Sequence, residues 1–223
     1  MIDEKKLVAD SLKEISFDKS LMITSLSEVD YGRSQQIKNE LNLKEITGKD
    51  MGIKFVDMNA YMALNMNGKK QNKYPDALMI NALKTRISDP KNIYIALKPN
   101  ANESSLIHEL AHALDFLNGS CIIPAFARAL SLEYIIPLEH LEHPQEFGYW
   151  FNYLKNKFNV IPDAEDMIIC ILYENRMLIK GKEIKEQNRE YLTKKSNEII
   201  KFLSENSQKI YSIIKNLPGY IGT

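Results

Sequence analysis

The chain has 223 residues, of which 44% are hydrophobic and 26% charged, values typical of one ordinary globular domain. Lysine plus arginine and aspartate plus glutamate number 29 each, so bulk charge favours neither nucleic-acid binding nor a polybasic membrane anchor. The amino-terminal segment is charged where a secretory signal is apolar, and no run of about eighteen apolar residues follows. Since Cys121 and Cys170 are the only cysteines, we expect reduced thiols in a cytoplasmic protein that does not enter a membrane.

The order of the predicted elements indicates an α+β protein, mostly helical, with a small mixed sheet of three to four strands. Alternating apolar residues predict strands over 53–58, 77–83 and 93–97, separated by turn residues. Helical spacing of apolar residues precedes and follows this region. We therefore expect a single domain over 1–223, made of N-terminal helices (1–50), the small sheet (51–100), helices that carry the site (101–160) and a C-terminal helical segment (161–223).

Residues 103–118 carry several independent signals of a helix. Asn102 is suited to cap the first turn, and Gly119 is suited to the position after the last one. Apolar residues recur three and four positions apart, so the helix has one face that can pack on a core. The residues of this apolar stripe are Leu106, Leu110, Ala113 and Leu117.

The sequence His-Glu-Leu-Ala-His, at 108–112 inside this helix, is the pattern that carries chemistry. Residues four apart share one helix face, so His108 and His112 can bind one metal ion, and zinc suits two imidazoles. Glu109 is offset by one residue, from where it can act as general base on a zinc-bound water. Asp115, three residues after His112, is either an exposed helical residue or a group that orients a ligand histidine.

A mononuclear catalytic zinc site needs a third protein ligand. Glu146 is the first candidate, because it begins a second predicted helix, 145–158, whose aromatic residues at 147–153 are predicted to pack in the core. A carboxylate in that first turn can point at the metal while the aromatic side chains fix the helix. The alternatives left open are Glu133, in a further predicted helix over 124–136, and either of two nearby histidines, His140 and His143.

These residues resemble the zincin metallopeptidases of the gluzincin type, in particular the group of the anthrax lethal factor catalytic domain. That group has a His-Glu-x-x-His helix followed by Ala-x-Asp, as in His112–Asp115, and a later helix whose first glutamate, matched by Glu146, binds zinc. The resemblance covers about 93–155, under a third of the chain. A weaker likeness, to ImmA/IrrE-type metallopeptidases, rests on the same motif helix and keeps Glu133 as a possible ligand.

The resemblance implies a fold in which 93–97 is an antiparallel edge strand beside the motif helix, where an extended peptide substrate pairs. The family's oxyanion-stabilising tyrosine falls at Glu139 here, so the resemblance leaves His140 or Tyr134 for that role. The family's second acidic residue in the glutamate helix falls at Trp150, which leaves that role unfilled.

The sequence thus predicts a zinc-dependent peptidase that acts on a peptide or protein substrate, with His108, His112 and Glu146 on zinc and Glu109 as base. The alternative is a non-catalytic or regulatory protein of zincin fold with a closed metal site that binds a protein partner. In that case the helical segments 1–46 and 160–223 would cover the cleft or hold the partner. Neither hypothesis involves nucleic acid or a membrane.

Overall fold

The structure is a computed structural model that describes residues 1–14, 16–65 and 74–218. Its contacts divide the chain into two compact units: the N-terminal unit, Asp3–Ala113, and the C-terminal unit, Leu114–Thr223 together with Met1–Ile2. The division falls inside one helix, α7 (Glu103–Asn118).

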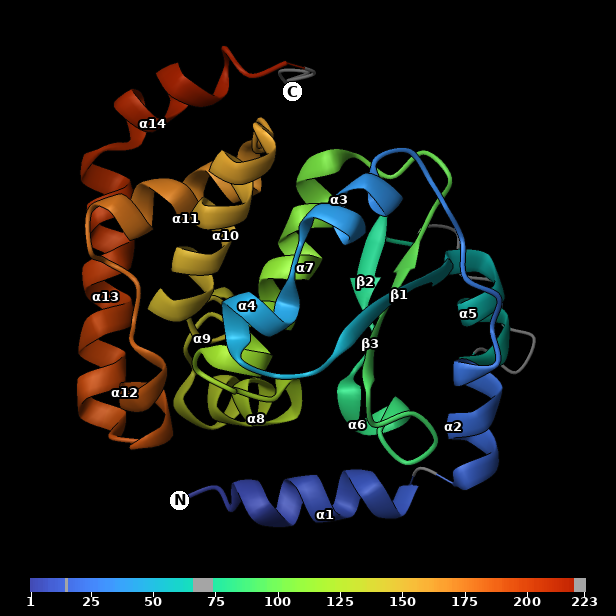
Figure 1. The fold of residues 1–223 in the computed structure, drawn as a ribbon. Helices are drawn as coiled ribbons and strands as arrows, with labels where there is room; N and C mark the ends of the chain where they lie inside the picture. The colour runs from blue at the N-terminus through green and yellow to red at the C-terminus, as the bar shows by residue number, and fades with distance from the viewer. Residues whose placement is uncertain (15, 66–73, 219–223) are drawn as a thin grey trace. The chain divides into compact units, whose positions relative to one another are not determined.

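The N-terminal unit combines a three-stranded sheet with short helices (Figure 1). The first fifty residues are helical, as predicted, and the last of these helices ends at Gly48, whose φ of +70° is the left-handed conformation that glycine adopts without strain. Besides the first part of α7, the elements are α1 (Glu4–Glu14), α2 (Phe17–Thr24), α3 (Ser34–Glu40), α4 (Leu43–Thr47), β1 (Gly52–Asp57), α5 (Met58–Asn65), β2 (Ala77–Met79), α6 (Ala82–Thr85) and β3 (Asn92–Leu97).

The sheet is mixed, with the order β1-β3-β2. β1 runs parallel to β3 and β2 runs antiparallel to it, so β3 is the central strand. The expectation that 93–97 is an edge strand is therefore wrong, because β3 has a hydrogen-bonded neighbour on each side and its residues Ile93 to Leu97 are at most 1% exposed. The three strands among mostly helical elements agree with the predicted α+β class.

Strand β2 is shorter than the predicted strand over 77–83. The difference arises at Asn81, whose side-chain oxygen accepts a hydrogen bond from the backbone N–H of Leu83 at 2.9 Å. An asparagine in this position caps a helix, so the chain leaves the sheet and enters α6. The antiparallel edge strand of this sheet is therefore β2, whereas β3 is the central strand.

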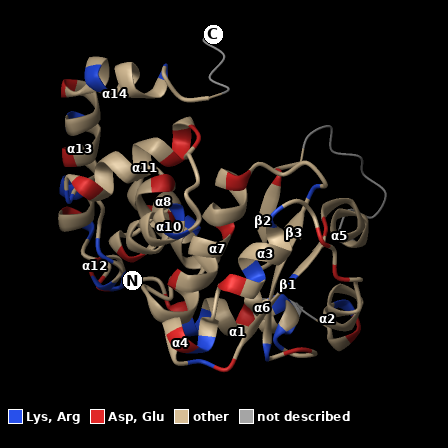
Figure 2. Cartoon of the chain, turned by 45° about the horizontal axis from the view of Figure 1, so that its top comes forward, with Lys and Arg blue, Asp and Glu red and all other residues tan. Residues whose placement is uncertain are grey.

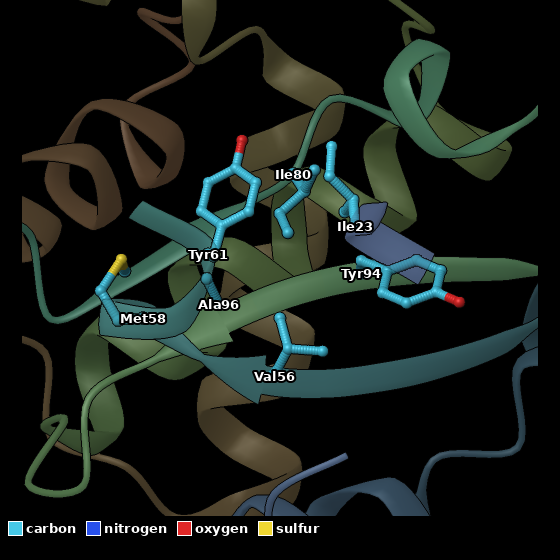
Figure 3. Packing of buried hydrophobic residues seen from close by; sticks show 7 residues of the cluster. All are labelled: Ile23, Val56, Met58, Tyr61, Ile80, Tyr94 and Ala96. Atoms are coloured by element: carbon cyan, nitrogen blue, oxygen red, sulfur yellow. The ribbon is translucent and has the colours of Figure 1, made fainter. Parts of the chain in front are cut away.

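One face of the sheet is covered by α2 and α5 (Figure 3). Val56, Tyr94 and Ala96 point from β1 and β3 toward the side chains of these helices. This packing buries large apolar surface, the main favourable term for folding of the unit. The cluster consists of Ile23, Val56, Met58, Tyr61, Ile80, Tyr94 and Ala96.

Helices α3 and α7 lie on the opposite side of the sheet from α5 (Figure 1). An ion pair of 2.8 Å between Arg33 and Glu103 joins the start of α3 to the start of α7. The predicted cap of α7 is confirmed, since the Asn102 side-chain oxygen accepts a hydrogen bond from the N–H of Ser105 at 2.7 Å. The predicted apolar stripe of α7 is also buried, with no member more than 4% exposed.

The C-terminal unit consists of helices in its described part (Figure 1). The helices predicted over 124–136 and 145–158 are confirmed as α8 and α10, and Phe147, Trp150 and Phe151 are buried, as expected of core residues. Besides the end of α7, the helices are α8 (Pro124–Tyr134), α9 (Glu139–Glu142), α10 (Gln145–Phe158), α11 (Ala164–Glu174), α12 (Gly181–Lys185), α13 (Arg189–Glu205) and α14 (Ser207–Ile214).

Charged residues of both signs alternate along α13 (Figure 2). Lys195 and Glu198 form an ion pair of 2.9 Å, and Lys201 and Glu205 one of 3.8 Å. Ion pairs three and four residues apart on an exposed helix add little stability, and they are typical of a helix face in contact with water.

Two further findings bear on the nature of the protein. Within the described ranges, no helix has both the length and the apolar character that crossing a bilayer requires. Cys121 and Cys170 are both free thiols, as expected.

Candidate metal centre

The two motif histidines lie on one face of α7. Their rings are 4.8 Å apart between centroids and inclined at 71°, and the two Nε2 atoms are 3.1 Å apart. Both side chains are half-buried, with the helix stripe beneath them in the core. The predicted juxtaposition of His108 and His112 is therefore confirmed.

A third histidine, His143, belongs to the C-terminal unit. It directly follows α9, and its ring lies 4.6 Å from the ring of Phe147 between centroids. Its side chain is half-buried.

The proposed base, Glu109, has a defined partner in the sheet of the N-terminal unit. Its Oε2 atom accepts a hydrogen bond from the backbone N–H of Met79, at the end of β2, with an N···O distance of 2.6 Å. Hydrogen bonds from an amide to a carboxylate are short and strong because the acceptor is charged. This contact holds one oxygen of the Glu109 carboxylate in place. Glu109 lies on α7, the helix that also carries His108 and His112.

Glu146 and Glu133 lie in different surroundings within the C-terminal unit. Glu146 is half-buried in the first turn of α10, as predicted, and its Oε2 accepts a hydrogen bond from the N–H of Gly181 at 2.8 Å. Glu133 is exposed on α8.

Asp115 binds the turn that follows α7. Its two oxygens accept hydrogen bonds from the backbone N–H and the hydroxyl of Ser120, at 2.7 and 2.5 Å. Burial, with a smaller contribution from the nearby charge of Glu146, raises the pKa of Asp115 to about 6, even though the hydrogen bonds from Ser120 act in the opposite direction. Position 119 requires a residue without a Cβ, because a Cβ there would lie 2.2 Å from an oxygen of the Asp115 side chain.

The two residues considered for oxyanion stabilisation, His140 and Tyr134, have partners within the C-terminal unit. The Nδ1 atom of His140 lies 2.9 Å from the hydroxyl of Ser196 on α13. Burial lowers the pKa of His140, which favours the neutral imidazole. The hydroxyl of Tyr134 donates a hydrogen bond to the carbonyl of Gln187 at 2.9 Å.

Comparisons with known proteins give no further guide to the site. No protein-family model, no curated protein and no solved structure matches the chain.

The structure also contains partners that the sequence did not indicate. Met79 contributes a backbone group, which every residue except proline has, so its identity carries no signal. Ser120 and Ser196 hold Asp115 and His140 from positions that are unremarkable in the sequence. For Ser120, the signal available was its place directly after the glycine that ends the helix.

Proposed function

We propose that this protein is a zinc-dependent peptidase in which His108 and His112 bind the metal together with a third protein ligand, and Glu109 is the general base. The observation that carries the proposal is the convergence of the two Nε2 atoms of His108 and His112, beside a carboxylate anchored on an edge strand.

The donor set fits zinc. Two nitrogens bound to one tetrahedral zinc at about 2.0–2.1 Å lie about 3.3 Å from each other, and the two Nε2 atoms are 3.1 Å apart. The two imidazoles are neutral ligands, which would leave a bound zinc ion a strong Lewis acid. Zinc held in this way would polarise a scissile carbonyl and lower the pKa of water toward neutral values.

Glu109 supplies the proton chemistry in this proposal. With Oε2 held by the Met79 amide, its other oxygen can accept a proton from water and pass it to the leaving amine. A carboxylate one residue from the first histidine is offset from the ligand face, so it reaches the water rather than the ion.

The third ligand in this proposal is one of the candidates that the sequence leaves open: Glu146, Glu133, His140 and His143. Catalytic zinc sites are known with two histidines and a glutamate and also with three histidines, so each of these residues has suitable chemistry.

Zinc content tests the metal site. Purified protein is expected to contain stoichiometric zinc by mass spectrometry of the metal, and His108→Ala and His112→Ala are expected to lose it. Single alanine variants at Glu146, Glu133, His140 and His143 identify the third ligand as the residue whose removal also abolishes zinc binding, and the other three variants are the matched controls. Retention of zinc by both His108→Ala and His112→Ala would contradict the metal site.

Cleavage of a mixed peptide library, read by mass spectrometry, tests the reaction. Glu109→Gln should retain zinc and lose about a hundredfold to ten-thousandfold in rate, the contribution of a general base. Zinc-loaded protein that cleaves nothing would instead favour the non-catalytic alternative. Equal cleavage by Glu109→Gln and the unchanged protein would contradict the role of Glu109.

A further inference from the structure

The outer edge of β2 is the edge that faces away from β3, and every second residue of the strand points its backbone N–H and C=O groups toward it. The N–H of Ile80 donates to the carbonyl of Tyr94, and the N–H of Lys98 donates to the carbonyl of Asp76, so even-numbered residues of this segment pair with β3. In an antiparallel ladder the intervening residues point their N–H and C=O groups away from the partner strand. The amides of Ala77 and Met79 therefore face the outer edge.

The two outer edges of the sheet differ. The outer edge of β1 is met by the preceding chain, through a bridge between Glu28 and Val56. In the described part of the chain no strand pairs with the outer edge of β2. Instead, Glu109 from α7 binds the Met79 amide at that edge.

We propose that the backbone N–H of Met79 positions the Glu109 carboxylate for its role as general base. This inference rests on the proposed function. A free glutamate side chain samples several rotamers, and a charge-assisted hydrogen bond to a strand that is itself held by β3 restricts it to one. The rigid element thus holds Oε2, and the second oxygen is presented in a fixed direction to its proton donor.

The geometry also defines a rival use of the same amide. An extended peptide added at the edge of β2 would need outward-facing N–H groups, and the Met79 N–H is one of two in this strand. If the amide bound substrate, its removal would weaken substrate binding and raise KM. If it positions Glu109, its removal slows the reaction of bound substrate and lowers kcat.

A proline at position 79 removes this N–H without removing a bond to β3. The Met79 amide faces outward, and proline is tolerated on edge strands in this orientation. Met79→Leu is the matched reference, because it keeps the N–H and a side chain of similar size. We expect kcat of Met79→Pro to be about tenfold to a hundredfold below that of Met79→Leu, with equal zinc content and KM within about twofold.

Hydrogen exchange of the Met79 amide tests the contact without zinc or substrate, and also if the proline variant fails to fold. In metal-free protein labelled with ¹⁵N-methionine, we expect Glu109→Ala to speed exchange of this amide by about tenfold or more. The amide of Met58, the first residue of α5, serves as an internal reference whose exchange should not change.

The outcomes separate this inference from the proposed function. Unchanged exchange in Glu109→Ala, an unchanged kcat in Met79→Pro, or a rise in KM alone would overturn the positioning role while leaving the peptidase intact. Absence of zinc and of cleavage in the unchanged protein would overturn the peptidase itself.

Discussion

The carboxylate of Asp115 is only 5% exposed, and its surroundings act on its pKa in opposite directions. Burial penalises the charged form, and this largest effect raises the pKa. The charge of Glu146 also raises the pKa, whereas the hydrogen bonds from Ser120 and the charge of Lys185 lower it. The result is a pKa of about 6 against an ordinary 3.8. A group with a raised pKa stabilises the fold fully below its ordinary pKa, and this contribution is lost as pH rises through the folded value.

Asp115→Asn should therefore change the pH dependence of stability. We expect the free energy of unfolding of the unchanged protein to fall, relative to that of the variant, by about 2–3 kcal/mol between pH 4 and pH 7, with most of the change below about pH 6. Urea unfolding of both proteins in EDTA measures this difference, since other titrating groups cancel. Ser120→Ala should move the midpoint to higher pH, and parallel curves would contradict the assignment.

At the scale of elements, α8 ends on a residue that is unfavourable for its conformation. Ile135 caps the helix with φ +58° and ψ +47°, and its side chain is 86% exposed. The left-handed region costs about 1–2 kcal/mol for residues with a Cβ, and β-branched residues are genuine outliers there. Since little of the side chain is buried, packing offers it little compensation.

Ile135→Gly is accordingly expected to stabilise the protein by about 0.5–1 kcal/mol, after allowance for the greater freedom of glycine in the unfolded chain. Leu132→Gly is the matched control: this residue is also exposed and apolar, but it lies inside α8, where glycine costs about 1 kcal/mol. Urea unfolding should therefore give opposite signs for the two variants. Destabilisation by both would show that the Ile135 side chain makes contacts that matter.

The elements also show which features follow from local sequence. Helices α7, α8 and α10 were predictable because apolar spacing and caps such as Asn102 act within a few residues. The central place of β3 in the sheet was not predictable, because apolar residues at every second position identify a strand but not its neighbours. The end of β2 was missed because the cap at Asn81 lies inside a run of apolar residues.

At the scale of the whole molecule, the local part of the site was predictable and the rest was not. His108, Glu109 and His112 lie within one helical turn, so their relative placement follows from α7 alone. The choice among His143, His140, Glu133 and Glu146 depends on the path of the chain over three later helices, which no local rule determines. The partner of Glu109 depends on the pairing of β2 with β3.

Metal binding should stabilise the folded chain, because the unfolded chain does not hold the ligands together. At a free zinc concentration of about a hundred times Kd, we expect the free energy of unfolding to rise by about 2.7 kcal/mol over that in EDTA. Thermal unfolding with and without zinc measures this gain. The gain should vanish in His108→Ala, and an equal gain in that variant would mean that zinc binds elsewhere.

The contact between Glu109 and the Met79 amide has a second consequence, for the behaviour of the protein in solution. An uncovered strand edge is a template on which another chain can add a strand, and proteins suppress such association with short edges and charged side chains. Strand β2 has three residues, and a carboxylate binds one of its two outward amides. Removing that carboxylate exposes the amide, so an inactive variant made by changing Glu109 to alanine should be checked for self-association before it is used to trap a substrate.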